Sequence, residues 1–276
     1  MRIQYKHQKF QAHAAKAVVD VFAGQPYLTP TYMMDRGSGY YQTSLSDERD
    51  FTGWSNQRII PELNDKLILE HLQKIQRANQ IAPSFKLEGR ADGYNLTIEM
   101  ETGVGKTYTY IKTMYQLNRA YGWSKFIIVV PSIAIREGVH KSFEMTQEHF
   151  AEEYGKKIRF FIYNSAQLTE IDRFASDSSI NVIIINSQAF NAKGKDDRRI
   201  YMKLDEFRSR RPIDIIAKTN PILIIDEPQS VEGKQTKENL KQFNPMITLR
   251  YSATHKSDSI YNMVYRLDAM EAYNTT

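Results

Sequence analysis

The sequence predicts an α/β fold in which helices surround a mainly parallel central sheet. Past residue 90, short runs rich in Val and Ile alternate with longer amphipathic stretches, the pattern of strand, crossover helix and strand in a parallel sheet. One stretch, 106–121, repeats apolar residues at helical spacing, and Gly122 follows as a stop signal. The expected strands lie near 94–99, 126–130, 158–163, 181–186, 222–226 and 247–251.

The segment between the first strand and the helix is a candidate phosphate-binding loop. It reads Met-Glu-Thr-Gly-Val-Gly-Lys-Thr over residues 100–107. Small residues let backbone N–H groups turn toward phosphates, Lys106 reaches the β and γ phosphates, and the Thr107 hydroxyl holds Mg²⁺. The helix dipole adds to the attraction for anions. The residues expected to bind the nucleotide are Thr102, Gly103, Val104, Gly105, Lys106 and Thr107.

A buried strand that ends in two carboxylates supplies the second half of such a site. Residues 222–225 are all Ile or Leu and lead into Asp226 and Glu227, after which Pro228 cannot continue the ladder. Because neighbouring side chains diverge at a strand end, Asp226 can support Mg²⁺ while Glu227 orients or deprotonates the attacking water. Taken alone, the segment is a weak signal, because a strand commonly ends in a solvated acidic turn. Together with the phosphate-binding loop, it indicates an ATPase.

The residues before the loop have a different character. Residues 1–24 are expected to form one amphipathic helix, and residues 61–80 a second. Between them, 25–60 holds Gly, Pro, Ser, Asp and several tyrosines without a clean period. We therefore expect 25–90 to be an insertion carried on the ATPase core.

Composition limits the function classes. The 276 residues are 41% hydrophobic and 25% charged, which is ordinary for a globular protein. The chain has no cysteine, which excludes disulfides and thiolate chemistry, and its six histidines never stand three or four apart as a metal-binding pair would. A net charge of +5 with a pI near 9.1 suits an anionic partner but does not require one. The polar first residues and strand-sized apolar runs predict no secretion signal, no membrane span and a cytoplasmic location.

Several segments resemble, in order, the motor domain of superfamily 2 helicase-like proteins, and more narrowly the restriction subunit of type III restriction-modification enzymes. Residues 99–107 resemble motif I, in which this superfamily often replaces the first glycine of the general pattern, here Met100. Val-Pro-Ser-Ile-Ala-Ile-Arg-Glu-Gly-Val at 130–139 resembles the motif Ia region. Asp-Glu-Pro-Gln at 226–229 resembles the motif II variant of type III enzymes.

Two further segments carry the same likeness. Gln11 resembles the glutamine motif that contacts adenine, and Ser-Ala-Thr-His at 252–255 resembles motif III, which couples the ATP state to DNA contacts. The resemblance implies a RecA-like P-loop domain, a three-layer sandwich that binds ATP and Mg²⁺. The implied site residues are Lys106, Asp226, Glu227 and Gln229 for catalysis, Thr107 and Asp226 for the metal, Gln11 for the nucleotide, Ser252, Ala253 and Thr254 for coupling, and Pro131, Ser132, Arg136 and Ser187 for the DNA backbone.

Plain structural roles compete with some of these assignments. Gln11 on an amphipathic helix can be a solvated residue, and Ser132 can be the N-cap of the helix that follows the strand 126–130. Ser252 and Thr254 can simply end a strand. The basic residues within 193–211 are diluted by acidic ones, which is typical of a solvated surface and weakens a DNA role.

The likeness also implies partners and an incomplete motor. Type III motors act on double-stranded DNA beside a modification methyltransferase subunit. We expect 91–256 to be the first RecA-like domain and 257–276 to begin a linker to a second one that this sequence lacks. Because such motors need an arginine from the second domain, we expect weak ATP binding, very slow hydrolysis and no DNA cleavage. The alternatives are a fragment of another superfamily 2 DNA or RNA helicase, and an inactive nucleotide-binding module that docks on a methyltransferase.

Overall fold

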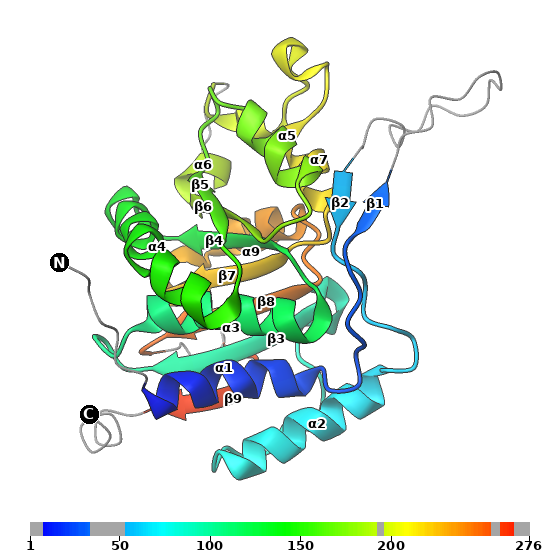
Figure 1. Cartoon of the computed structure of the whole chain (residues 1–276), viewed down its shortest axis with the longest axis vertical. Coiled ribbons are helices and arrows are strands. Elements are labelled where there is room, and N and C mark those ends of the chain that lie inside the picture. Colours follow the sequence, from blue (N-terminus) through cyan, green and yellow to red (C-terminus); the bar gives the residue numbers. More distant parts are fainter. Residues whose placement is uncertain (1–7, 34–52, 192–195, 255–259, 268–276) are drawn as a thin grey trace.

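A parallel sheet forms the centre of the protein in a computed structural model, which describes residues 8–33, 53–191, 196–254 and 260–267. Its strands are β3 (Tyr94–Met100), β4 (Lys125–Val130), β5 (Arg159–Ile162), β6 (Asn181–Asn186), β7 (Ile222–Asp226), β8 (Ile247–Ser252) and β9 (Asn262–Leu267). They are ordered β5-β6-β4-β7-β8-β3-β9, and every neighbouring pair is parallel (Figure 1). The predicted α/β fold with a mainly parallel sheet is therefore confirmed.

The six predicted strands are all present, with ends within one residue of their expected positions. Strands β4, β6 and β7 are buried along their whole length, because helices cover both faces of the middle of the sheet. Strand β9 was not predicted. Its residues were assigned to the start of a linker, but they pair in parallel with β3 and lie in the sheet.

Helices form a layer on each face of the sheet. One apolar core joins the sheet to α1 (Lys9–Val21), α2 (Asp65–Ala78), α3 (Lys106–Tyr121) and α4 (Ile133–Tyr154). A second core lies on the other face, under α5 (Thr169–Ser176), α6 (Gln188–Asn191), α7 (Pro212–Lys218), α8 (Pro228–Val231) and α9 (Lys234–Lys241). Short 3₁₀ turns occur at η2 (Arg90–Asp92), η3 (Asp196–Tyr201) and η4 (Asp205–Phe207). The result is the expected three-layer sandwich.

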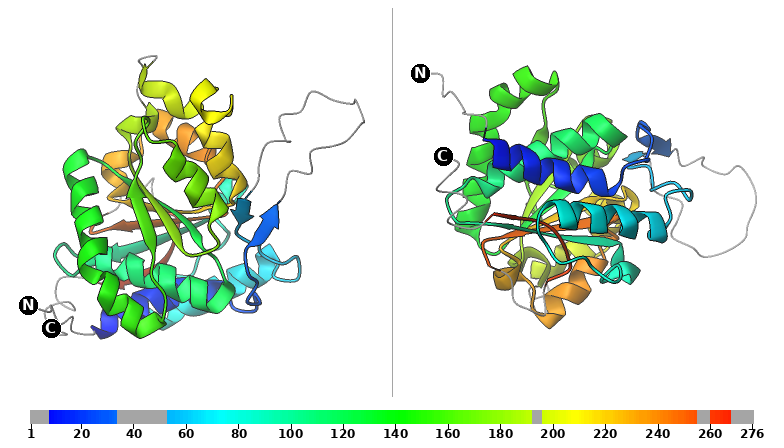
Figure 2. Two further views of the ribbon diagram at one scale, coloured as in Figure 1. Left: turned by 45° about the horizontal axis from the view of Figure 1, so that its top comes forward. Right: turned by 90° about the horizontal axis from the view of Figure 1, so that it is seen from below.

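The N-terminal third joins this sandwich rather than standing apart from it. The predicted first helix corresponds to α1, although residues 1–7 lie outside the described part of the chain. The predicted helix at 61–80 corresponds to α2, which begins after Asn64, whose side chain accepts a hydrogen bond from the Leu67 N–H at 3.1 Å. Figure 2 shows α1 and α2 side by side along the β9 edge of the sheet.

A small antiparallel ribbon connects the two helices. Its strands are β1 (Thr31–Met33) and β2 (Gly53–Ser55), neither of which was predicted. Just after β2, the buried Asn56 accepts hydrogen bonds from the Ser124 and Lys125 N–H groups at 2.7 and 3.0 Å, and it donates to the Lys125 and Asn220 carbonyls at 3.0 Å each. This amide fastens the segment to the amino ends of β4 and β7. The division of the chain at residues 24, 90 and 256 remains a prediction.

No helix within the described residues is both long and apolar enough to cross a bilayer.

Candidate functional site

The candidate site lies at the carboxyl edge of the sheet. Parallel strands all end on the same side, so the loops that follow β3, β4, β6, β7 and β8 leave one edge, on the left in Figure 1. The ribbon of β1 and β2 lies toward the opposite edge. Strands β7, β8 and β3 are neighbours in the sheet. This order brings the phosphate-binding loop together with the carboxylates at the end of β7 and the Ser-Ala-Thr segment at the end of β8.

The phosphate-binding loop turns sharply between β3 and α3. Gly103 and Gly105 have φ values of +84° and +85°, which are left-handed conformations that residues with a Cβ rarely adopt. A Cβ on Gly105 would also lie 2.6 Å from Gln11 Nε2, so this glycine permits a close approach of α1. Met100 is fully buried as the last residue of β3. Its φ is not positive, so the backbone at this position does not require glycine.

Gln11 supports the phosphate-binding loop from behind. Its side chain is 7% exposed, and its Nε2 donates a hydrogen bond to the Val104 carbonyl at 2.9 Å. The plain reading of Gln11 as a solvated residue is wrong, because the amide is buried against the loop. Its contact with adenine remains a prediction.

Lys106 and Glu227 form an ion pair across the site. The distance from Lys106 Nζ to Glu227 Oε1 is 2.7 Å, and their side chains are 11% and 24% exposed. Glu227 has φ +53°, a strained conformation for a residue with a side chain. Its N–H donates to the Tyr251 carbonyl at 3.0 Å, which fixes the turn after β7 against the end of β8.

The other carboxylate oxygen of Glu227 belongs to a polar cluster. Gln229 Nε2 donates to Glu227 Oε2 at 2.6 Å, and Ser252 Oγ lies 2.8 Å from the same oxygen. Ser252 Oγ is also 2.8 Å from Gln229 Oε1 and 2.6 Å from the Thr254 carbonyl. A hydroxyl has one proton, so Ser252 can donate to only one of these three acceptors at a time. The arrangement gives Ser252 alternative hydrogen bonds.

The two adjacent carboxylates have pKa values shifted in opposite directions. Burial, and then the charge of Glu227, raise the pKa of Asp226 to about 6. Burial also raises the pKa of Glu227, but hydrogen bonds from Lys106, Gln229 and Ser252 outweigh it and leave that pKa below its ordinary value. Glu227 is therefore ionised at neutral pH, whereas Asp226 is poised for stabilisation by a cation.

The chemistry of these groups fits a triphosphate with Mg²⁺. The Thr107 hydroxyl and the Asp226 carboxylate are hard oxygen donors, which Mg²⁺ prefers. A Cβ on Gly103 would meet no described atom within 4 Å, so the front of the loop is open. Lys106, the first residue of α3, supplies a positive charge beside the loop, and the N-terminus of α3 favours an anion.

The four DNA-backbone candidates form a second cluster at the same edge. The Ser187 N–H donates to the Val130 carbonyl at 3.0 Å, so the loops after β4 and β6 lie side by side. Ser132 is the N-cap of α4, as its plain reading predicted, because Oγ accepts from the Ile135 N–H at 3.3 Å. Arg136 donates to Asn186 Oδ1 at 3.2 Å and to Glu137 Oε1 at 2.8 Å. The structure brings Pro131, Ser132, Arg136 and Ser187 together, and their contact with DNA remains a prediction.

Some features of the edge were not predicted. Asn186 is the residue that orients Arg136, and its position as the last residue of β6 was the signal that could have identified it. Ala253 and Thr254 follow Ser252 in the described chain, but His255 of the predicted motif lies outside the described residues.

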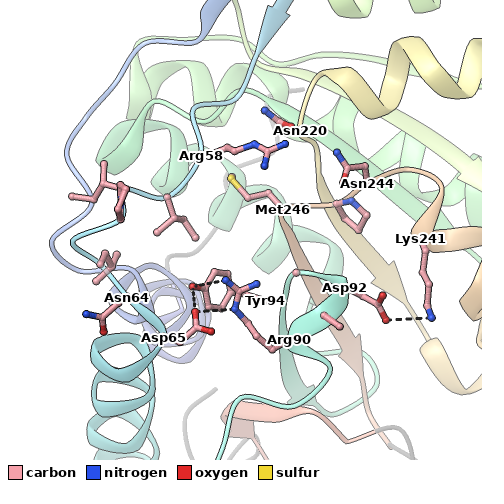
Figure 3. A pocket seen from close by; sticks show the side chains of 17 residues that line it. Arg58, Asn64, Asp65, Arg90, Asp92, Tyr94, Asn220, Lys241, Asn244 and Met246 are labelled. Atoms are coloured by element: carbon pink, nitrogen blue, oxygen red, sulfur yellow. Dashed lines mark hydrogen bonds and ion pairs between the residues drawn. The ribbon is translucent and has the colours of Figure 1, made fainter. Parts of the chain in front are cut away.

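A hollow lies at the opposite edge of the sheet and does not suit a triphosphate. It encloses about 760 Å³ near the starts of β3, β7 and β8 (Figure 3). Arg90 pairs with Asp65 at 2.9 Å, and Lys241 lies 3.5 Å from Asp92. Carboxylates thus offset both of these cations. The carboxyl edge remains the better candidate because the glycine loop, Lys106 and the paired acids converge there.

Comparisons with known proteins identify the family that this chain resembles. The sequence pattern of the family described as "Type III restriction enzyme, res subunit" matches residues 54–257. The chain is 35% identical over 231 residues to the type III restriction-modification enzyme EcoP15I Res subunit of Escherichia coli. It is 32% identical over 230 residues to the EcoPI Res subunit of Escherichia phage P1. Each match covers 77% of this chain but only 24% and 23% of the relatives, so the chain spans about a quarter of their length.

Solved structures are more distant. The Sulfolobus solfataricus SWI2/SNF2 ATPase core in complex with dsDNA is 15% identical, with a TM-score of 0.39 over 72% of this chain and 34% of that one. A score this low carries no weight for the fold or for function, so the fold assignment rests on the sheet topology.

Proposed function

The chain belongs to the type III restriction enzyme Res subunit family, as a helicase-like ATPase domain, and on that premise we propose that it couples ATP hydrolysis to translocation or switching on double-stranded DNA. The observation that carries this proposal is the convergence of Lys106, Asp226 and Glu227 on one phosphate-binding loop. A domain that served only as scaffold would have no need for a strained Glu227 aimed at the loop lysine.

Lys106 and the loop would hold the nucleotide. The ammonium now paired with Glu227 would move to the β and γ phosphates, because a triphosphate carries more charge than one carboxylate. The loop N–H groups and the N-terminus of α3 would bind the remaining phosphate oxygens. Thr107 and Asp226 would hold Mg²⁺, which neutralises charge on the phosphates when bound.

Glu227 would then orient the attacking water. Once Lys106 turns to the phosphates, Glu227 keeps the hydrogen bonds from Gln229 and Ser252 on Oε2, and Oε1 becomes free to accept a proton from water. Of the groups that lower the pKa of Glu227, Gln229 and Ser252 stay in contact with it after Lys106 has turned away. Ser252 Oγ lies within hydrogen-bond distance of both Glu227 Oε2 and the Thr254 carbonyl, which supports the assignment of Ser252 and Thr254 as coupling residues.

Double-stranded DNA is the proposed partner at the cluster of Pro131, Ser132, Arg136 and Ser187. The N-terminus of α4 and a guanidinium held by Asn186 suit backbone phosphate. The relatives are named as restriction-modification enzymes, which supports a modification methyltransferase subunit as the protein partner. An arginine from another domain commonly stabilises charge on the transferred phosphoryl group, so we expect slow hydrolysis by this chain alone.

The test is ATP hydrolysis by the chain with and without double-stranded DNA. We expect slow turnover that DNA stimulates, and a loss of about a hundredfold in kcat for Glu227→Gln with ATP affinity retained, because a positioned base contributes on that order. Hydrolysis that is unchanged in Glu227→Gln contradicts the assignment. A chain that binds ATP but neither hydrolyses it nor responds to DNA supports the alternative of an inactive nucleotide-binding module.

A further inference from the structure

Tyr110 contacts one of the two groups assigned to the metal. It lies one helical turn beyond Lys106 and Thr107, on the same face of α3, and its side chain is fully buried. Its hydroxyl donates to Asp226 Oδ2 at 3.3 Å. The phenol therefore links the helix that carries Lys106 and Thr107 to the carboxylate at the end of β7.

The direction of this hydrogen bond follows from the chemistry of the two groups. A phenol keeps its proton at neutral pH and can donate it, whereas a carboxylate oxygen accepts, so Tyr110 is the donor to Asp226. The bond engages one oxygen of Asp226, and a carboxylate has a second oxygen to offer a metal.

Packing does not explain the hydroxyl. The Tyr110 ring lies edge-on against Tyr251, with centroids 5.5 Å apart and an interplanar angle of 68°. A phenylalanine would make the same ring contact, and a buried hydroxyl without a partner costs free energy. The hydroxyl of Tyr110 is thus retained with its polar partner, Asp226.

Tyr251 provides a matched comparison within the same core. It is also fully buried, and its hydroxyl lies 3.1 Å from Thr113 Oγ1. Thr113 uses its own proton to bond the Thr109 carbonyl at 2.8 Å, so Tyr251 is the donor to Thr113. The two tyrosines share a ring contact and complete burial, but of these two hydroxyls only that of Tyr110 reaches Asp226.

We propose, on the basis of the nucleotide site described above, that Tyr110 is a positioning residue that holds Asp226 in the arrangement that receives Mg²⁺ with the nucleotide. Its hydroxyl fixes the side-chain rotation of Asp226. It contacts neither the phosphates nor the attacking water, and it acts only through Asp226.

The test compares Tyr110→Phe with Tyr251→Phe in the full chain. Affinity for a fluorescent ADP analogue is measured in excess Mg²⁺ and again in EDTA. For Tyr110→Phe we expect affinity in Mg²⁺ to fall about tenfold, the usual effect of losing a hydrogen bond to a charged group, with affinity in EDTA unchanged. Tyr251→Phe should match the wild type under both conditions.

The EDTA measurement also controls for folding, because a misfolded variant loses affinity under both conditions. Equal losses with and without Mg²⁺, or no loss in Mg²⁺, overturn the role of Tyr110. A second variant covers the case in which Tyr110→Phe folds poorly: Asp226→Asn alone should weaken binding only in Mg²⁺, and adding Tyr110→Phe to it should weaken binding no further. A further tenfold loss in that double variant overturns the proposal. If the wild type binds no nucleotide, the proposed function itself fails, which is a separate outcome.

Discussion

Two of the ion pairs between a basic residue and a glutamate in this domain differ mainly in burial. Lys106 and Glu227 are 11% and 24% exposed and meet at the open carboxyl edge. Arg250 and Glu232 are 6% and 1% exposed and meet inside the domain at 2.8 Å. Arg250 also donates to Asn95 Oδ1 at 2.7 Å and stacks on the Tyr261 ring at 3.9 Å. The Lys106–Glu227 pair, here called the outer pair, can exchange partners with a ligand. In the Arg250–Glu232 pair, here called the inner pair, Arg250 is also held by Asn95 and Tyr261.

The comparison shows that an ion pair can stabilise the fold when it is buried and can open to a ligand when it lies at an edge. A buried pair is costly to break because the remaining charge stays in a low-dielectric interior. A pair at an edge gives up little when it opens, since water or a phosphate can replace the lost partner. Arg250 lies on β8 and Glu232 just after α8, so the inner pair connects β8 to the segment that follows β7. It thereby stabilises the part of the domain that carries the outer pair.

The largest expected effect comes from breaking the inner pair. Arg250→Met leaves Glu232 buried without its charge partner, and we expect the free energy of unfolding to fall by about 3–5 kcal/mol. Denaturant unfolding measures it. Lys106→Met is the matched change at the outer pair, and its cost should stay below about 1 kcal/mol, because Glu227 keeps Gln229 and Ser252. Similar losses at the two sites would erase the distinction between the pairs.

A double substitution sharpens this comparison. Arg250→Met combined with Glu232→Leu removes both charges and retains apolar volume, so most of the stability lost in Arg250→Met should return. A double variant as unstable as the sum of the two single variants would show that the charges do not interact. The same unfolding experiment decides between these outcomes.

A third buried cation lacks a carboxylate in direct hydrogen-bond contact and tests the effect of burial through pH. Lys125 is fully buried and donates to the Phe174 carbonyl at 2.5 Å and to the Asp177 carbonyl. Burial lowers its pKa from 10.5 to about 7, although the charge of Asp177 opposes the shift. The folded state then binds fewer protons than the unfolded state between pH 7 and 10.5, so this residue makes stability rise with pH in that window.

The measurement compares the wild type with Lys125→Met, which has no titrating group there. The free energy of unfolding of the wild type, relative to the variant, should rise by about 1 kcal/mol per pH unit above pH 7 and be flat below it. A difference that does not change between pH 7 and 9.5 would mean that Lys125 keeps an ordinary pKa.

The smallest expected effect lies at Ser252. Ser252→Ala removes one of two hydrogen-bond donors to Glu227 Oε2, while Gln229 remains. We expect kcat for ATP hydrolysis to fall about fivefold, in line with a hydrogen bond of about 1 kcal/mol, and ATP affinity to stay unchanged. Steady-state kinetics separate the two. A loss of affinity with unchanged kcat would place Ser252 in nucleotide binding instead.

The sequence allowed prediction of those parts of the fold that have local signals. The strands at 126–130, 181–186 and 222–226 could be identified because buried parallel strands contain continuous apolar runs, and the phosphate-binding loop because its glycines and lysine lie close together in the sequence. Strand β9 was not predicted because its apolar run is short: the strand begins at Asn262, and Arg266 interrupts the apolar residues. Its place in the sheet is determined by pairing with β3, which lies far away in the sequence.

The contacts of the site depended on the fold in the same way. Asp226 and Glu227 could be predicted as neighbours at a strand end, but their opposite pKa shifts depend on burial and on Ser252, which only the folded chain brings near. The Tyr110 contact with Asp226 spans 116 residues, and a tyrosine at helical spacing is indistinguishable from a core residue in the sequence. Patterns thus locate the groups, and packing decides how they act.

The most direct test of the account is calorimetric binding of ATP with Mg²⁺ to the wild type and to Lys106→Ala. The account predicts saturable one-to-one binding by the wild type and affinity at least about tenfold weaker in the variant, because Lys106 carries the charge that meets the phosphates. Arg250→Lys, which keeps the inner charge, serves as the control and should bind as the wild type does. Equal ATP affinity in the wild type and Lys106→Ala would contradict the assignment of the carboxyl edge as the nucleotide site.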